Sequence, residues 1–475
     1  MPREFTAEQL RAVNTRGKDI LVSAAAGSGK TAVLVERIAE LNCINRLLVV
    51  TFTEDAALEM KSRLVQRLSE KSEAAASDEE QDEILRQLAL VPSAHVSTIH
   101  AFCKRLLKQY FHLTDADPGA RIGDKAELEL ISGRAMEELF EEEYAKENNA
   151  DFFDLVESYG GKKTDDDKLD ELIKKYFLFI ESSDYPEYTA LKYAAMYDGV
   201  SPGNAADVWL EPVKKEISAV LDGAEAKLQM SFSICGEPSG PLEYKKAIND
   251  DLNQIDFLRD CLNGTLHEIC KAFKLLTFPT IHTYRVKDEI DPVLKNRAKN
   301  LRDSAKTDLR DLVSRFLFAS AEKLTADIEA LGPAVRTLTK LTLAYREKYR
   351  ALKRERGLLD FNDLEHYAVS ILLDGGPENP VPSAAALEIS KKYNEILIDE
   401  YQDSNAVQEL ILWAVSGGGA VPRFMVGDLK QSVYKFRRAS PEIFIGKYLS
   451  YSIDVNSCSG LKIDLNKNFR SRPAV

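Results

Sequence analysis

Long apolar segments are what this 475-residue chain lacks most clearly. No run approaches the roughly 18–20 apolar residues that a membrane-spanning helix needs. The first ten residues, MPREFTAEQL, contain no apolar stretch of the kind found in secretory signal peptides. We therefore expect a cytoplasmic protein that has no membrane partner.

Paired cysteines are also missing. The six cysteines are scattered along the chain, and no two of them form a CxxC pair. Such spacing is typical of a reducing compartment, and it argues against both a disulfide framework and a zinc site.

Positive charge is the third shortage. The chain has 63 Lys and Arg against 76 Asp and Glu, which gives a formal net charge of −13. This balance excludes a polycation that coats nucleic acid, but an acidic body can still carry a locally basic groove. The hydrophobic share of 44% and the charged share of 29% are ordinary for a folded protein. At about 150 residues per domain, the length predicts two or more domains.

The first hundred residues alternate between short apolar runs and segments with helical spacing. Strands are expected at 18–23, 47–52 and 95–98, and helices at 30–41, 56–68 and 100–110. The acidic stretch 71–83 is interpreted as a solvated loop or linker. Alternation of this kind predicts a parallel sheet with helices on both faces.

The pattern changes after residue 112 and changes back near residue 357. Residues 113–356 have long charged segments with helical periodicity and almost no β-rich run. Strand-like runs return at 395–399, 423–428 and 461–465. The sequence therefore predicts an α/β domain interrupted by a large, mostly helical insertion, with ligands beyond the carboxyl ends of the strands.

A glycine-rich turn follows the first predicted strand and opens a helix. The turn fits a P-loop, in which backbone N–H groups wrap phosphate oxygens. Lys30 is then expected to reach the β- and γ-phosphates, and Thr31 to bind Mg²⁺. The predicted ATP-binding residues are Ala24, Ala25, Ala26, Gly27, Ser28, Gly29, Lys30 and Thr31.

Two adjacent acids end the predicted strand at 395–399. An apolar strand that delivers Asp399 and Glu400 suits a Walker B motif, in which the first acid holds Mg²⁺ and the second orients water. Acids are common at strand ends, so this pattern gains its meaning from the P-loop.

Two further patterns stay open on the residues alone. Gln9 has an amide that can read both the donor and the acceptor on the edge of adenine, or it is a surface glutamine. Residues 426–438 interleave aromatic and basic side chains, which suits either stacking of single-stranded bases or an amphipathic helix with core aromatics.

Taken in order, these segments resemble a superfamily 1 helicase of the UvrD/Rep/RecB type. The motifs that carry the resemblance are Gln9, AAAGSGKT (24–31), TFTEDAALEM (51–60), STIHAF (97–102), DEYQDS (399–404), GDLKQSVYKFRRA (427–439) and LNKNFRS (465–471). The resemblance implies a RecA-like domain 1A at 1–112 and 357–460, a helical insertion domain 1B at 113–356, and the start of a second RecA-like domain at 461–475.

The resemblance also implies roles for individual residues. Lys30 and Thr31 would hold phosphate and Mg²⁺, Asp399 would hold Mg²⁺, and Glu400 would be the general base. Gln431 would sense the γ-phosphate, and Arg470 would act as an arginine finger. The implied DNA-binding residues are Phe52, Thr53, His100, Tyr434, Phe436 and Arg437.

Finer signs favour the AddA branch of bacterial helicase–nuclease subunits, including LLDFNDLEHYAVSIL at 358–372 and the Lys430 and Arg438 variants. This branch implies an ATP-driven 3′→5′ translocase on single-stranded and duplex DNA, with an AddB-like partner, in double-strand break repair. The family usually continues beyond the last motif, so we expect an N-terminal part of a longer protein, able to bind ATP but almost unable to hydrolyse it alone. The alternatives are a stand-alone repair helicase and a DNA-binding module without motor activity.

Overall fold

A computed structural model of the chain describes most of its residues. The described ranges are 5–25, 27–159, 167–201, 206–281, 290–431, 440–457 and 460–467, with only the backbone described at 206 and 207. Within them the fold is α/β with a parallel sheet, as the sequence predicts. None of the described helices is both long and apolar enough to cross a lipid bilayer.

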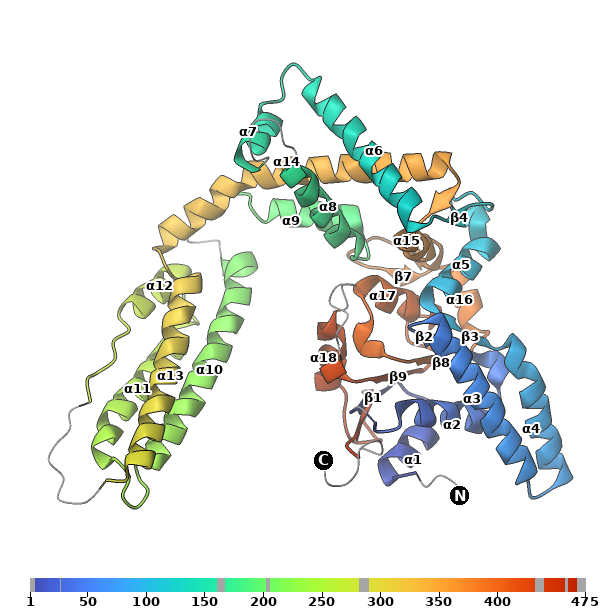
Figure 1. Cartoon of the computed structure of the whole chain (residues 1–475), viewed down its shortest axis with the longest axis horizontal. Coiled ribbons are helices and arrows are strands. Elements are labelled where there is room, and N and C mark those ends of the chain that lie inside the picture. The colour runs from blue at the N-terminus through green and yellow to red at the C-terminus, as the bar shows by residue number, and fades with distance from the viewer. Residues whose placement is uncertain are drawn as a thin grey trace. The chain divides into compact units, whose positions relative to one another are not determined.

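The central feature is a six-stranded sheet in which every paired neighbour is parallel. In spatial order the strands are β10 (Leu461–Leu465), β1 (Ile20–Ala24), β9 (Arg423–Gly427), β8 (Glu395–Ile398), β2 (Leu47–Thr51) and β3 (His95–Thr98). Because all strands run the same way, their carboxyl ends meet at one edge of the sheet (Figure 1).

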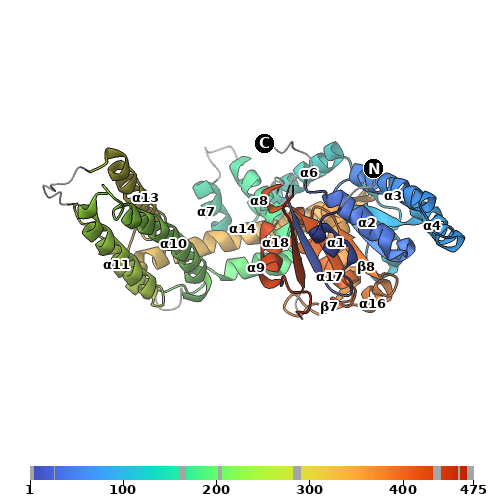
Figure 2. The same ribbon diagram turned by 90° about the horizontal axis from the view of Figure 1, so that it is seen from below.

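Helices cover both faces of this sheet (Figures 1 and 2). Alternate residues of a strand point to opposite faces, so Leu48 and Val50 of β2 enter one core while Leu47 and Val49 enter the other. One layer holds α1 (Ala7–Asn14), α2 (Lys30–Leu41), α3 (Glu54–Glu73) and α4 (Asp78–Leu90). The other holds α5 (Ile99–Tyr110), α15 (Phe361–Leu372), α16 (Ala384–Ser390), α17 (Ala406–Val415) and α18 (Pro441–Ser450). Both faces are buried, which explains why the central strands β1, β9, β8 and β2 are mostly apolar, while the edge strands β10 (LKIDL) and β3 (HVST) are not.

One local prediction was wrong. The stretch 71–83 is not a loop, because α3 continues to Glu73 and α4 begins at Asp78. Ser77 caps α4 by accepting a hydrogen bond from the Glu80 amide at 3.2 Å. The acids that suggested a solvated linker fill the first turn of that helix, where the helix dipole favours negative charge.

Between β4 (Arg121–Ile122) and β5 (Leu358–Leu359) the regular structure of the described residues is helical. The α-helices of this region are α6 (Lys125–Tyr144), α7 (Ala150–Tyr159), α8 (Asp167–Glu181), α9 (Pro186–Ala195), α10 (Glu211–Ile234), α11 (Lys245–Cys261), α12 (Leu266–Lys274), α13 (Pro292–Phe316) and α14 (Ala321–Glu355).

The chain forms two compact units. The first, which holds the sheet, comprises Met1–Asn149, Val156–Ala190 and Leu341–Val475; the second comprises Ala150–Leu155 and Leu191–Lys340. The second unit has its own apolar core, built by residues such as Ile217, Ile248 and Leu309. The predicted domain boundaries at 112, 356 and 460 stay predictions, and β10 pairs with β1 within the first unit.

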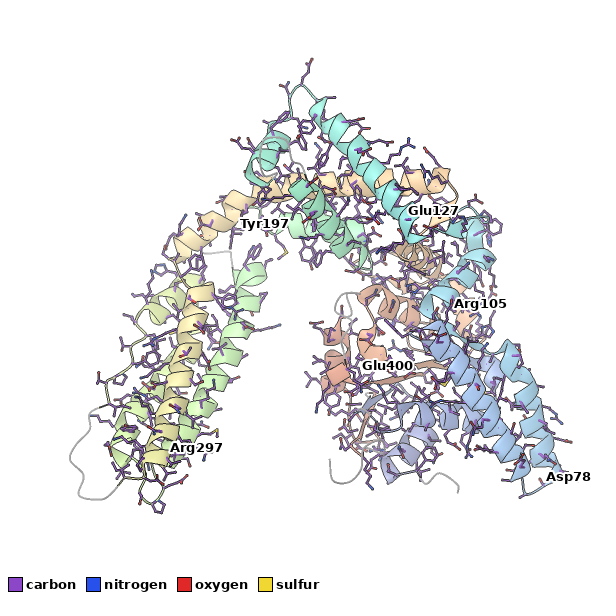
Figure 3. All side chains as sticks on the ribbon, viewed as in Figure 1. Asp78, Arg105, Glu127, Tyr197, Arg297 and Glu400 are labelled. Carbon is purple, nitrogen blue, oxygen red and sulfur yellow. The ribbon has the colours of Figure 1, made fainter. Side chains whose placement is uncertain are left out.

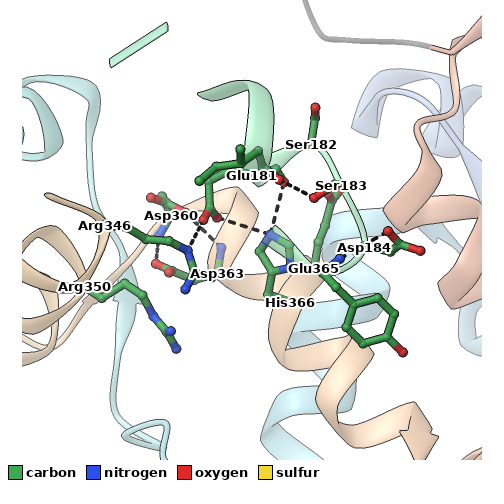
Figure 4. A network of polar contacts seen from close by, with 12 residues as sticks. Glu181, Ser182, Ser183, Asp184, Arg346, Arg350, Asp360, Asp363, Glu365 and His366 are labelled. Carbon is green, nitrogen blue, oxygen red and sulfur yellow. Dashed lines mark hydrogen bonds and ion pairs between the residues drawn. The ribbon is translucent and has the colours of Figure 1, made fainter. Parts of the chain in front are cut away.

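A buried polar network joins three helices of the first unit (Figure 4). Glu181, the last residue of α8, pairs with Arg346 of α14 and lies 3.2 Å from Nε2 of His366 on α15. Burial would raise the pKa of Glu181, but the hydrogen bond and charge of His366 and the charge of Arg346 hold this pKa at about 2. The ionised carboxylate therefore stabilises the packing of these helices.

We expect Glu181→Gln to lower the free energy of unfolding of the first unit by up to about 3 kcal/mol at neutral pH. The pKa of Glu181 is lower in the folded chain than its ordinary 4.5. The contribution of ionised Glu181 to the free energy of unfolding is therefore complete above pH 4.5 and is lost as the pH falls toward 2. Urea unfolding at a series of pH values should show the wild type and the variant converging in acid.

Fluorescence of Trp413 on α17 reports on this unit, because Trp209, the other tryptophan, lies in the second unit and can be replaced by Phe. Glu187→Gln on α9 is the control, since this side chain is exposed. A pH-independent difference between Glu181→Gln and the wild type would contradict the assignment.

Candidate nucleotide site

Three neighbouring strands end at the same place and deliver the polar residues of the candidate site. β1 leads into the glycine-rich turn, β8 into Asp399 and Glu400, and β9 into Asp428. These strands lie in the order β1, β9, β8. Their carboxyl ends therefore bring together side chains that are about 400 positions apart in the sequence. Figure 3 marks Glu400 at this edge.

The turn after β1 has the backbone of an anion-binding loop. Gly27 and Gly29 both have positive φ, at 76° and 86°, and Gly29 caps the N-terminus of α2. A side chain at Gly29 would be strained there, and its Cβ would lie 3.0 Å from Nε2 of Gln9. The first turn of α2 thus presents N–H groups toward the end of the sheet, which suits a phosphate.

Lys30 faces Glu400, which follows β8, and Gln431, which follows β9. Its Nζ lies 2.9 Å from Oε2 of Glu400 and 3.5 Å from Oε1 of Gln431. Only 12% of the Lys30 side chain is exposed, against 34% for Glu400. The structure therefore brings together three of the four residues predicted to be catalytic.

The two acids differ in their surroundings. Burial, together with the negative charge of Glu400, raises the pKa of Asp399 to about 6. Glu400 has a left-handed backbone with φ of 49°, a conformation that costs energy for any residue other than glycine. Strain of this kind is typical of a residue whose side chain is held in a required direction.

The oxygen atoms present suit Mg²⁺. Thr31 offers a hydroxyl and Asp399 a carboxylate, and the raised pKa of Asp399 shows a carboxylate whose negative charge a cation would stabilise. The described residues contain no group of three or more His, Cys, Asp or Glu side chains placed to hold a metal. Mg²⁺ usually binds through one or two protein oxygens, substrate phosphates and water.

Gln9 is tied to the glycine-rich turn. Its Oε1 accepts a hydrogen bond from the Thr6 amide at 2.9 Å, and its Nε2 donates to the Ser28 carbonyl at 2.9 Å. The side chain borders a cavity of about 140 Å³ that Asp464 and Lys467 also line. The cavity lies beside the glycine-rich turn, because Ser28 is also part of its lining. Adenine reading by Gln9 stays a prediction.

The predicted DNA-binding residues that the structure describes lie after β2 and β3. Thr53 caps α3 by accepting from the Ala56 amide at 3.1 Å, and Phe52 is partly buried beside it. His100 on α5 has its Nε2 3.1 Å from Oε1 of the buried Glu365. Its ring centre lies 4.7 Å from that of Phe361.

Five predicted site residues lie outside the described residues: Ala26, Tyr434, Phe436, Arg437 and Arg470. Their roles stay predictions.

Several residues that the structure brings to this site were not predicted from the sequence. Gln402, Asp403 and Asp428 lie within the motifs quoted for the resemblance, but no role was predicted for any of them. Phe361 and Glu365 contact His100 from a segment about 260 residues away. A clue for Phe361 in the sequence is that it directly follows Asp360, a residue type that caps helices. The structure shows that 53% of Phe361 is exposed.

A buried ion pair holds the helix of the glycine-rich turn against the strand that bears the acids. Arg37 of α2 donates from Nε to Oε1 of Glu395 on β8 at 2.7 Å, and from Nη1 to the Ala12 carbonyl at 2.6 Å. Its guanidinium also lies 4.3 Å from the ring centre of Phe424. Arg37 thus joins α1, α2, β8 and β9 behind the candidate site.

Comparison with known proteins places this architecture in a family. The model of the UvrD/REP helicase N-terminal domain matches residues 5–451. Proteins named as ATP-dependent helicase/nuclease subunits are similar over the whole chain, with 39% identity in Desulforamulus reducens and 38% in Alkaliphilus oremlandii. The protein of that name in Bacillus licheniformis is 40% identical over 99% of the chain. The chain spans 38% of the length of each of these three relatives.

Proposed function

Because the chain belongs to the UvrD/REP helicase N-terminal domain family, we propose that it is the nucleotide-binding part of an ATP-driven DNA helicase. The observation that carries the proposal is the meeting of Lys30, Glu400 and Gln431 beyond three adjacent strands. A cation from a phosphate-binding loop, a carboxylate and an amide are the groups that hydrolysis of a phosphoanhydride requires.

Each of these residues then has a role. The turn at 24–31 binds the phosphates, and Lys30 leaves Glu400 to neutralise the β- and γ-phosphates. Thr31 and Asp399 hold Mg²⁺, which supplies charge neutralisation when it is bound. Glu400 accepts a proton from the attacking water, Gln431 contacts the γ-phosphate, and Arg470 completes the site as an arginine finger.

The finer proposal concerns the whole protein. The similar proteins are named as helicase/nuclease subunits, so we propose that this chain belongs to the 3′→5′ translocase of an AddAB-type machine in double-strand break repair, with an AddB-like partner. We propose that this machine acts in the cytoplasm, on single-stranded and duplex DNA.

Single-stranded DNA is proposed to run past the residues after β2 and β3. Phe361 supports this path because it is an exposed aromatic ring beside His100, one of the predicted backbone-contacting residues. Aromatic rings stack on any base, which suits a translocase without sequence preference. Phe52, Tyr434 and Phe436 are the other proposed stacking residues, and Thr53 and Arg437 are proposed beside the backbone.

The test is DNA-stimulated ATP hydrolysis and strand separation by the intact protein that carries this chain. We expect unwinding of a duplex with a 3′ single-stranded tail and none with a 5′ tail.

Phe361→Ala should weaken binding of single-stranded DNA by about 1–3 kcal/mol, and binding should weaken steeply with added salt. Phe111→Ala, at another exposed Phe of the same unit, should bind like wild type.

Binding of ATP and DNA without strand separation would indicate a DNA-binding module in place of a motor. Equal unwinding from both tails would contradict the 3′→5′ direction alone.

A further inference from the structure

Gln402 is a fully engaged side chain at the centre of the candidate site. It lies in the short 3-10 helix Tyr401–Asp403 after β8, and only 1% of it is exposed. Its Nε2 donates to Oε2 of Glu400 at 2.8 Å and to Oδ2 of Asp403 at 3.0 Å. Its Oε1 accepts from the Asp428 amide at 2.9 Å. Both amide hydrogens and the amide oxygen are therefore used.

These bonds close a ring of five residues. Lys30 Nζ meets Glu400 Oε2 at 2.9 Å, and the same oxygen accepts from Gln402. Gln402 reaches the backbone of Asp428, whose Oδ2 accepts from Gln431 Nε2 at 2.8 Å. Oε1 of Gln431 accepts from Lys30 Nζ at 3.5 Å, which closes the ring. Gln402 is the member that joins the acids after β8 to the segment after β9.

The backbone of β9 leaves room for this amide. A Cβ atom on Gly427 would lie 2.5 Å from Oε1 of Gln402 and 2.9 Å from Cε2 of Phe444. Contacts that short do not occur, so any larger residue at position 427 would displace Gln402 or the strand end. Glycine at this position and the buried amide are therefore parts of one arrangement.

We propose that Gln402 is a positioning residue for ATP hydrolysis, which fixes the Glu400 carboxylate and couples it to Gln431. This inference rests on the proposed function. Lys30 and Gln402 both donate to Oε2 of Glu400. When Lys30 moves to bind a phosphate, the hydrogen bond from Gln402 would still orient the carboxylate.

The contacts require a hydrogen-bond donor at this position. Gln402 lies between two carboxylates, and its NH₂ group supplies one N–H to each. Burial and the charge of Glu400 raise the pKa of Asp403 to about 6, so a further negative charge would be unfavourable here. Glutamate at position 402 would keep the acceptor for Asp428 and lose the donor, while methionine would remove both without adding charge.

In the intact protein that carries this chain, we expect Gln402→Glu and Gln402→Met to lower kcat for DNA-stimulated ATP hydrolysis by about 100-fold, because a small misplacement of a reacting group has an effect of that size. The KM for ATP should stay within about threefold of wild type, because the phosphate-binding turn and Lys30 are unchanged. The matched control is Gln87→Glu on α4, another buried glutamine, bonded to the Ile44 amide and remote from the site. It should keep the wild-type kcat even if it unfolds more easily.

Gly427→Ala tests the position of Gln402 from β9, because the added Cβ would displace the Gln402 amide. We expect Gly427→Ala to lower kcat, and to lower it less in the Gln402→Ala background, since the shortened side chain relieves the closest contact. Strictly multiplicative effects of the two changes would contradict the proposal, as would a wild-type kcat in Gln402→Met. If Gln402→Glu does not fold, Gln402→Met and the Gly427 cycle still decide the matter.

Failure of this inference is distinguishable from failure of the proposed function. If Glu400→Gln abolishes hydrolysis while the Gln402 variants turn over normally, the site is an ATPase site and Gln402 is only structural. If Glu400→Gln itself keeps full turnover, the proposed role of Glu400 is wrong and Gln402 has nothing to position.

Discussion

Glu400→Gln should reduce ATP turnover by about 10²–10⁴-fold in the intact protein while leaving ATP binding in place. The amide keeps the size of the side chain and its contact with Gln402, but it cannot accept a proton from water. Because Lys30 is paired with Glu400 at 2.9 Å, removing the charge also frees Lys30 for phosphate. The variant should therefore bind ATP at least as tightly as wild type.

Steady-state hydrolysis with and without single-stranded DNA, together with equilibrium binding of a fluorescent ATP analogue, measures both effects. Lys30→Ala gives the opposite pattern, with weakened binding as well as lost hydrolysis, since it removes the cation aimed at the phosphates. Glu59→Gln, on the exposed face of α3, is the control and should match wild type. Turnover by Glu400→Gln within about threefold of wild type would show that Glu400 is not the general base.

Arg37→Ala should lower the free energy of unfolding of the first unit by about 3–5 kcal/mol. Arg37 has no exposed surface, and its loss leaves the carboxylate of Glu395 buried without its cation. Burial lowers the pKa of Arg37 and raises the pKa of Glu395, so each group depends on the other for its charge. The Ala12 carbonyl loses its donor as well.

Urea unfolding followed through Trp413, in the Trp209→Phe background, measures this loss. Two comparisons separate burial from charge. Arg63→Ala removes an exposed ion pair with Glu59 and should cost less than about 1 kcal/mol. The double variant Arg37→Met, Glu395→Met should recover a large part of the stability, because apolar side chains of similar size carry no buried charge. If Arg37→Ala costs no more than Arg63→Ala, the buried pair does not hold α2 against β8.

The strands, and the positions of the candidate site residues at their ends, were predictable because their signals are local. A buried parallel strand must be apolar along its whole length, and a phosphate-binding turn needs glycines at fixed spacing before a helix. Lys30, Asp399, Glu400 and the β1, β8 and β9 runs could therefore be placed from sequence alone. The same local logic failed at 71–83, where acids near Ser77 start a helix, because composition does not distinguish a solvated loop from a helix N-terminus.

The sequence by itself determined the α/β class, the turn that suits phosphate and the acids at a strand end, since each depends on residues close together in the chain. Only the tertiary structure decided the strand order, which brings residues about 400 positions apart to one edge. It alone also revealed Gln402 between Glu400 and Asp428, Phe361 against His100, and Arg37 against Glu395. The physical reason is that a hydrogen bond or a ring contact depends on distances in space, and no local pattern in the chain encodes which distant partner a side chain will meet.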